Sequence, residues 1–381
     1  MSCVPGSLRL PESEAEHHEH LSCPIAANTR RQTTTTIESG DLLNKTRRER
    51  VASRQSLRVK RGQDLLRLVR LVNFKTREYV TILPGLGARV HEIVLRAGKE
   101  RHSILESPHS RRGIIENKGF GGAKLIPYPG RVKPGAYSFE DKSHVLRASR
   151  PGQRAIHGFI HDRRFKIKKV TVKASSAFVE LEHIHRGTAE GFPFAFSVRI
   201  LYGLNSSGFV CNTRIRNLGK RPMPVGDGWH PYFKTGGPIG RSVISLPRHS
   251  VVELSHEKVP TGKLLKPRRG GRVMRIGKRT IDSVLDLGGQ RRRVITTLSE
   301  PRSGFSIRLW QTAGVGGYRY LVVYTHPRRL SVALEPWSCA PDAFNNGMGL
   351  VVLKAGKSFS GSYGVSLRGQ KSARQSVSKR T

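Results

Sequence analysis

The sequence contains few acidic residues for its length. Its 381 residues include 27 Asp and Glu against 68 Lys and Arg, which gives a formal net charge of +41. Residues 1–66 hold 11 basic and 8 acidic residues, so 57 and 19 remain for residues 67–381, and the excess is not a property of one terminus. Such a surface predicts non-specific binding of polyanions such as nucleic acid. A general compositional bias toward arginine, or adaptation to unusual ionic conditions, is the alternative, because no basic run alternates with aromatic residues.

Cysteine and long hydrophobic runs are also scarce. The four cysteines, Cys3, Cys23, Cys211 and Cys339, form no CxxC pair and no disulfide-type spacing. This spacing is typical of reduced thiols and predicts a cytoplasmic protein. No stretch approaches the roughly 18 apolar residues of a membrane span. The N-terminus has no apolar signal core, so neither membrane insertion nor secretion by a signal peptide is expected.

Amphipathic runs of helical length are few, and short strand-like runs are many. The chain has 40 Gly and 21 Pro, which divide it into short segments. Alternating or continuous apolar runs between these breaks predict strands. The predicted strands are residues 68–74, 79–83, 89–95, 165–172, 177–183, 194–201, 209–215, 243–246, 294–297, 305–310, 318–324, 331–334 and 362–367. The pattern predicts an all-β fold of many antiparallel strands, as a large sandwich or barrel.

Composition divides the chain into three parts. Residues 1–65 are polar or basic and are expected to form a partly disordered extension. Residues 66–368 form the predicted β-domain, and residues 369–381 a basic tail. A cluster of acidic and histidine residues at 16–20, near Cys23, has metal-binding side chains, but its spacing fits no regular zinc site.

One carboxylate stands out. Glu335 follows an apolar strand and precedes Pro336, which restricts it to extended geometry, so we expect it to be held stiffly at a strand end. Trp337 and Phe344 lie nearby in the sequence, and low polarity raises a carboxyl pKa. Glu335 is therefore a candidate general base, with an ordinary surface glutamate as the alternative.

Three further side chains stand in unusual contexts. Arg131 ends a Gly-rich and Pro-bounded stretch that has no phosphate-loop ending, and its guanidinium can bind sugar hydroxyls or a carboxylate. His157 precedes a glycine, and His230 lies between a tryptophan and a Pro-Tyr-Phe run whose rings suit stacking on a sugar. Together with Glu335, two histidines make an acid–base set near neutral pH. Metal ligation by the histidines stays open, although no HExxH-type motif supports it.

Taken together, these stretches resemble the aldose 1-epimerase (galactose mutarotase) family. The segments that carry the resemblance are residues 122–131 (GAKLIPYPGR), 155–159 (AIHGF), 228–233 (GWHPYF), 334–336 (LEP) and 340–347 (APDAFNNG). They occur in the family's order and approximate spacing. Residues 84–90 resemble its opening strand and turn, and residues 260–262 its central loop. The likeness covers about residues 66–368.

The resemblance implies a β-supersandwich with its site in an open cleft, and no metal or organic cofactor. By analogy with the family, Glu335 matches the general base and His230 the general acid of an aldose 1-epimerase acting on a hexose. His157 and Arg131 match sugar-binding positions. Asp282 is the nearest match to a sugar-binding aspartate, and Asp286 is the second.

Two departures from the family leave the substrate open. Gly130 stands where the family often has Asn, which removes one side-chain contact, and the basic stretch 263–279 has no counterpart. A hexose-6-phosphate 1-epimerase is therefore an alternative, motivated by the positive charge. A non-catalytic carbohydrate-binding protein with nucleic-acid affinity is another, since a fold does not fix a function. The sequence does not predict the oligomeric state.

Overall fold

The computed structural model describes residues 35–36, 58–59, 66–148, 155–173, 175–265, 271–289 and 291–369. The chain divides into two units, Met1–Thr33 and Thr34–Thr381. All of the described residues belong to the second unit. The histidine cluster at residues 16–20 and the predicted tail lie outside the described residues.

The largest element of the fold is a nine-stranded antiparallel sheet in the order β18-β15-β20-β21-β25-β12-β11-β10-β9. Its strands are β9 (Lys166–Lys173), β10 (Ser176–Arg186), β11 (Ala195–Asn205), β12 (Gly208–Asn217), β15 (Val243–Leu246), β18 (Arg272–Arg275), β20 (Arg292–Ser299), β21 (Phe305–Ala313) and β25 (Ser358–Gly369). Buried and more exposed residues alternate along parts of several of these strands. In β11, Phe196, Val198 and Ile200 are fully buried while Arg199 between them is exposed. One face therefore contacts the core and the other contacts solvent.

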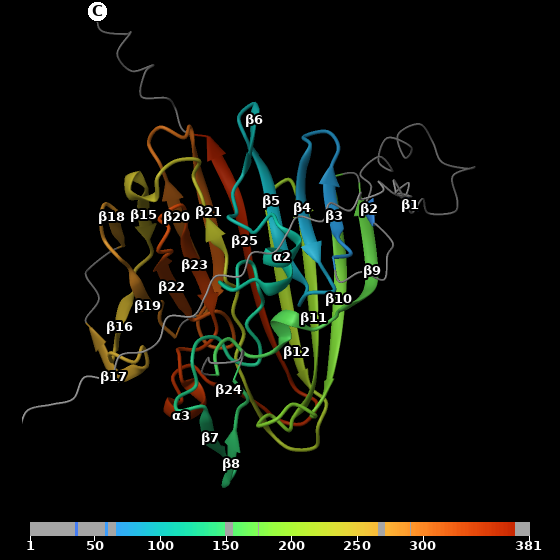
Figure 1. Ribbon diagram of the computed structural model, residues 1–381, viewed down its shortest axis with the longest axis vertical. Coiled ribbons are helices and arrows are strands. Elements are labelled where there is room, and N and C mark those ends of the chain that lie inside the picture. Colours follow the sequence, from blue (N-terminus) through green and yellow to red (C-terminus); the bar gives the residue numbers. More distant parts are fainter. Residues whose placement is uncertain are drawn as a thin grey trace, which may run out of the picture. The chain divides into compact units, whose positions relative to one another are not determined.

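A six-stranded sheet packs against the buried face of the nine-stranded sheet. It contains β1 (Thr35–Thr36), β2 (Arg58–Val59), β3 (Val69–Asn73), β4 (Glu78–Leu83), β5 (Arg89–Ala97) and β6 (Glu100–Ser103), in that order. Strand β3 contacts β10 and β11, and β5 contacts β25, as Figure 1 shows for the blue and cyan strands. The two sheets enclose the main core, to which Leu71, Val80, Val179 and Ile200 belong.

A second six-stranded sheet carries the candidate site. Its order is β14-β23-β22-β19-β16-β17. The strands are β14 (Tyr232–Phe233), β16 (Ser250–Leu254), β17 (Pro260–Leu265), β19 (Asp282–Asp286), β22 (Tyr320–Thr325) and β23 (Val332–Trp337). A smaller apolar cluster lies on one of its faces, and its members are Phe120, Ala123, Leu125, Val252, Val284, Tyr320, Val322, Trp337 and Ala340.

The remaining elements are short. Strands β7 (Ala136–Phe139) and β8 (Lys142–Val145) form a hairpin, and β13 (Met223–Val225) pairs with β24 (Val351–Leu353). The described residues contain two short α-helices, α2 (Arg111–Glu116) and α3 (Ala343–Asn346), and two 3-10 turns, η1 (Ile160–Asp162) and η2 (Ile239–Arg241). None of the described helices is long and apolar enough to cross a membrane.

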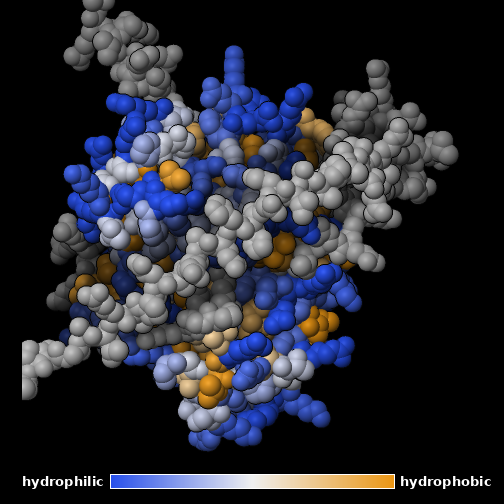
Figure 2. Space-filling view, viewed as in Figure 1, coloured by the Kyte–Doolittle hydropathy of each residue, from blue (hydrophilic) through white to orange (hydrophobic). Residues whose placement is uncertain are grey.

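The predicted all-β class and every predicted strand are confirmed, with bounds that differ by a few residues. The sequence did not predict β1, β2, β6, β7, β8, β13, β14, β16, β17, β18, β19 or β24, which are short and alternate poorly. The basic stretch 263–279 contains the end of β17 and all of β18, so it links two sheets. The face seen in Figure 2 is mostly hydrophilic, with small separate hydrophobic groups, as the low apolar content predicts.

Candidate active site

Strand register gathers the candidate site on one face of the second six-stranded sheet. Glu335 on β23 lies opposite Val322 on β22, which lies opposite Val284 on β19. Asp282 lies opposite Tyr324 in the next row on the same face. Because side chains two residues apart point to the same face of a strand, Glu335, Tyr324 and Asp282 share this face. The apolar side chains between them form part of the smaller apolar cluster.

Glu335 is a buried carboxyl group with two polar neighbours. It is 1% exposed, and its Oε2 accepts a hydrogen bond from the indole Nε1 of Trp337 at 3.1 Å. Its Oε1 lies 3.6 Å from Nε2 of His230. Burial raises the pKa of Glu335 well above its ordinary value, the Trp337 hydrogen bond lowers it in part, and the charge of Asp282 raises it further.

Glu335 lies inside a strand, whereas the sequence placed it at a strand end. Strand β23 continues through Pro336 to Trp337. The proline is tolerated because β14 pairs only with Val332 and Ala333, so no ladder hydrogen bond on that side needs its missing N–H. Strand pairing of the residues before and after Glu335 consequently fixes the position of its carboxyl group.

His230 is held through its backbone. Its N–H donates to the carbonyl of Ala123 at 3.1 Å, and its own carbonyl accepts from the N–H of Gly122 at 2.7 Å. Gly122 has a φ of +70°, and a Cβ there would collide with the carbonyl oxygen of Val90, so glycine is required. Burial lowers the pKa of the His230 imidazole to about 3. The imidazole is therefore neutral at physiological pH in the absence of substrate.

His157 completes the cluster from a different loop. Its Nδ1 accepts a hydrogen bond from the backbone N–H of Gly130 at 3.1 Å, which leaves the proton of the neutral ring on Nε2. Its ring centroid lies 5.4 Å from that of His230 and 5.8 Å from that of Trp337. The structure thus brings Glu335, His230 and His157 together from segments far apart in the sequence.

Arg131 lies at the periphery of this cluster. It follows Gly130, whose φ is +75°, and a Cβ at that position would lie 2.9 Å from the ring of Trp337 and 3.1 Å from Cα of Pro341. The glycine that departs from the family pattern therefore allows the Trp337 ring to pack directly against the backbone. The charge of Arg131 lowers the pKa of Tyr324, while burial and the charges of Asp282 and Glu335 raise it, so these groups all act on one phenol.

The two candidate aspartates have different environments. Asp286 is 4% exposed, and Arg319 binds both of its oxygens at 2.9 and 2.6 Å. Asp282 is exposed and makes an ion pair with Lys258 at 3.2 Å. Of the two, Asp282 is the one whose charge acts on Glu335. Lys258 belongs to the β16–β17 turn, where the adjacent Glu257 contacts Lys133.

A second buried charge cluster, which sequence reasoning missed, lies beside the first. Nζ of Lys124 is 2.8 Å from Oδ1 of Asp227, and both side chains are fully buried. The hydroxyl of Tyr318 donates to Oδ2 of Asp227 at 2.6 Å. The backbone N–H of Ser338 donates to the carbonyl of Asp227 at 2.8 Å, and the backbone N–H of Asp227 donates to the hydroxyl of Ser338 at 2.8 Å. The only sequence signal was a lysine in the middle of an apolar run, which implies a partner without identifying it.

The described residues contain no group of three or more His, Cys, Asp or Glu side chains that could hold a metal ion. The candidate site consists of one carboxyl group, two imidazoles and an indole donor over an apolar floor. Such a set can accept and donate protons at a bound polar ligand.

Comparisons with known proteins agree on the family and the fold. Residues 70–366 match the family model described as aldose 1-epimerase. An uncharacterized protein of Escherichia coli K12, YihR, is 25% identical over 244 residues, which is 62% of this chain and 75% of that protein. A galactose mutarotase-like protein from Clostridium acetobutylicum has a TM-score of 0.68 at 18% identity, over 80% of this chain and 95% of its own. A galactose 1-epimerase from Lactobacillus acidophilus has a TM-score of 0.63 at 14% identity, over 89% and 100%.

Proposed function

The chain belongs to the aldose 1-epimerase family, and on this premise we propose that it interconverts the α and β anomers of a hexose. One observation carries the proposal. A carboxyl group that burial holds out of water lies 3.6 Å from an imidazole nitrogen, so one bound sugar can contact both groups. The fold shared with the galactose 1-epimerase of Lactobacillus acidophilus supports the same activity.

The proposed reaction moves one proton between two oxygens of the sugar. In the active state His230 carries a proton and Glu335 is ionised. Glu335 takes the proton of the anomeric hydroxyl while His230 gives its proton to the ring oxygen, and the bond between C1 and the ring oxygen breaks. Rotation about C1–C2 presents the other face of the aldehyde, and the reverse transfers close the ring to the other anomer.

The pKa shifts fit the middle of this cycle. After ring opening, Glu335 is protonated and His230 is neutral. This is the same protonation state that burial favours in the protein without substrate, because it raises the pKa of the carboxyl and lowers that of the imidazole. The buried site therefore stabilises the state that accompanies the open-chain aldehyde, and the substrate's hydroxyls must stabilise the ionised pair.

Three further residues are assigned to substrate binding. The Nε2–H of His157 is a fixed donor beside the reacting pair, because Gly130 occupies the other ring nitrogen. Arg131 and Asp282 offer a donor fork and an acceptor at the periphery, both within electrostatic range of Tyr324. The apolar floor, including Trp337, suits the hydrophobic face of a pyranose ring.

Polarimetry on freshly dissolved α-D-glucose and α-D-galactose tests the proposal. The protein should speed relaxation to an unchanged final rotation, and Glu335→Gln should lower this acceleration by on the order of 100- to 10,000-fold. Glu300→Gln, at another buried glutamate (4% exposed) outside the site, is the matched control and should retain the rate. An active Glu335→Gln variant would show that another group is the base.

A phosphorylated hexose is the second candidate substrate. Two cations favour it, since Arg131 has no ion-pair partner among the described residues and Lys258 lies at the same edge of the site. The ratio of rates on glucose 6-phosphate and glucose, compared between the native protein and Arg131→Gln, decides between the two. A ratio near one in both proteins excludes a phosphate subsite.

A further inference from the structure

The solvent face of the nine-stranded sheet carries an unusual density of arginine. Strand register places these side chains on one face, because Arg199 lies opposite Arg214, Arg214 opposite Ser360, and Arg308 opposite Ser366. Residues an even number of positions away along each strand share this face. The set, called the arginine face below, is Arg186, Arg199, Arg214, Arg216, Arg275, Arg293, Arg308 and Arg368.

Little acidic charge opposes this face. Within the described strands of the sheet, its acidic side chains are Glu180 and Glu182, both on β10. Arg199 binds Glu182 at 2.7 Å and lies 3.8 Å from Glu180, and Lys168 binds Glu182 at 3.2 Å. The carboxylates are therefore already paired at one edge, and the arginines of β12, β25, β21 and β20 keep their excess charge.

The face also has a hollow of suitable size and chemistry. A cavity of about 320 Å³ is lined by Glu182, Ile184, Ser197, Arg199, Arg214, Arg216 and Leu218. Ile184 and Leu218 are exposed by 53% and 45%, so the hollow offers apolar surface to a ligand. The hollow thus combines apolar side chains and three arginines with one carboxylate, Glu182, whose charge Arg199 and Lys168 already pair. The base of one nucleotide can contact the apolar side chains, and its phosphate can contact the arginines.

A stacked pair of side chains, Arg293 on Trp310, lies farther across the same face. Trp310 packs on Gly364, where a Cβ would lie 2.6 Å from its indole nitrogen, so the ring lies close over the sheet. The guanidinium of Arg293 lies 4.1 Å from the centroid of this ring. A guanidinium held on an aromatic ring is a preorganised platform on which an unpaired base can stack.

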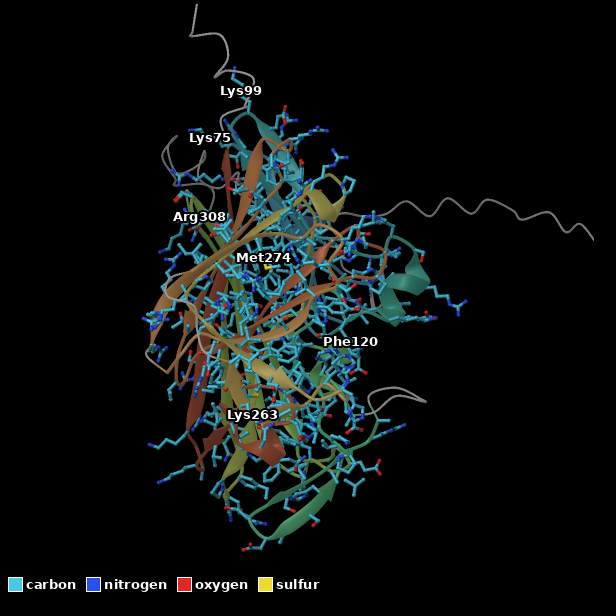
Figure 3. All side chains as sticks on the ribbon, turned by 90° about the vertical axis from the view of Figure 1, so that its left-hand side faces the viewer. Lys75, Lys99, Phe120, Lys263, Met274 and Arg308 are labelled. Carbon is cyan, nitrogen blue, oxygen red and sulfur yellow. The ribbon has the colours of Figure 1, made fainter. Side chains whose placement is uncertain are left out.

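We propose that the arginine face binds single-stranded nucleic acid, with one nucleotide in the hollow and the backbone crossing the strands toward Arg293 and Trp310. Phosphates can pair with the arginines of β12, β25, β21 and β20, which have no carboxylate partner among the described residues of this face. The apolar side chains and the guanidinium platform need exposed base faces, which a duplex conceals. Figure 3 shows Arg308 and Phe120, a member of the smaller apolar cluster beside the candidate site, on different sides of the large sheet. Binding at this face is therefore separate from the sugar chemistry.

Fluorescence anisotropy of the full chain with a labelled oligothymidylate about 20 nucleotides long tests the proposal at about 0.1 M salt. The variant Arg214→Ser/Arg216→Ser/Arg308→Ser should bind on the order of 100-fold more weakly, and the slope of log K against log salt should fall by about 2. The charge-matched control is Lys75→Ser/Lys99→Ser/Arg101→Ser, at exposed positions in and beside the β3–β4 and β5–β6 turns (Figure 3), and it should bind within about threefold of the native protein.

Three results would overturn the proposal. Equal losses in both variants would mean that binding follows net charge alone. Tighter binding of a DNA duplex or of heparin than of the single strand would assign the face to another polyanion. Absence of binding would remove the function altogether. Polarimetry on both variants provides the fold control, and because none of these residues lies in the sugar site, failure of one proposal leaves the other unaffected.

Discussion

Asp227 and Glu335 are both fully buried carboxyl groups, yet their surroundings differ in one respect. Asp227 has a lysine within 2.8 Å and a tyrosine hydroxyl within 2.6 Å. Glu335 has an indole donor and an imidazole whose pKa is lowered to about 3. The first carboxylate has a permanent counter-charge, and the second has none.

This difference separates a structural carboxylate from a reactive one. A buried ion pair with full hydrogen bonding keeps its charge and fixes the chain around it. A buried carboxyl without a cation is held toward its neutral form, and it acts as a general base once a bound substrate has stabilised its charged form. Burial alone therefore does not identify the candidate site, and the partner of the buried group does.

Removal of Lys124, the counter-charge of Asp227, should produce the largest loss of folding stability. Lys124→Met leaves Asp227 buried and unpaired, which should lower the free energy of unfolding by about 3–5 kcal/mol in a urea titration. The double variant Lys124→Met/Asp227→Leu should regain most of this stability, because no unpaired charge remains. If the double variant is no more stable than the single one, the ion pair is not what separates the two carboxylates.

The imidazole of His230 should make the protein sensitive to acid. Its pKa is lowered to about 3 in the folded protein and returns to about 6.5 on unfolding, so the unfolded chain binds more protons between these values. Stability should fall as pH drops below about 6.5, by on the order of 3 kcal/mol at pH 4. In urea titrations at several pH values, His230→Gln should lack this loss of stability at low pH. If the free energy of unfolding depends on pH equally steeply in both proteins, the imidazole is not buried in its neutral form.

The carboxyl of Glu335 should make folding stability change with pH in the opposite direction. Its raised pKa means that the folded protein keeps a proton that the unfolded chain has lost, so its contribution to stability decreases as pH rises above the ordinary carboxyl value. Glu335→Gln should therefore be as stable as the native protein at low pH and more stable at pH 8, because the amide has no proton to lose. A variant that is less stable at pH 8 would mean that Glu335, like Asp227, has an effective counter-charge.

The smallest effect is expected from the indole donor. Trp337→Phe removes the hydrogen bond that favours the ionised form of Glu335, so the pKa of the carboxyl should rise further. The acidic limb of the pH–rate profile should move to higher pH, and the rate at pH 7 should fall about two- to fivefold, the equivalent of under 1 kcal/mol. An unchanged acidic limb would exclude Trp337 from control of the base.

The sequence predicted the strands better than it predicted the contacts among them. Long alternating strands such as β10 and β11 were evident, because their period of two is unmistakable. Strands β16 and β19, which form part of the floor of the site, are short and were missed. Glu335, His230 and His157 were singled out by their neighbours in the sequence and assigned roles by resemblance.

Other parts of the site depended on packing that one sequence does not specify. Nothing local identifies Asp227 as the partner of Lys124, 103 residues away. Gly130 looked like the loss of a contact, whereas its positive φ and the closely packed Trp337 ring mean that a side chain at that position would force its neighbours to shift. These features follow from three-dimensional proximity, which periodicity and motif spacing leave undetermined.

The bonds that hold the candidate site together also set when it can form during folding. The Lys124–Asp227 pair closes 103 residues, the Asp227–Ser338 bond 111, and the bond from Asn345 to the carbonyl of Lys133 closes 212. Contacts of such sequence separation have a high loop-closure entropy and form late. Sheet hairpins can therefore assemble first, and the reactive carboxyl becomes desolvated only when nearly the whole chain has folded. Recovery of activity during refolding should coincide with the last spectroscopic phase, so catalysis itself reports complete folding.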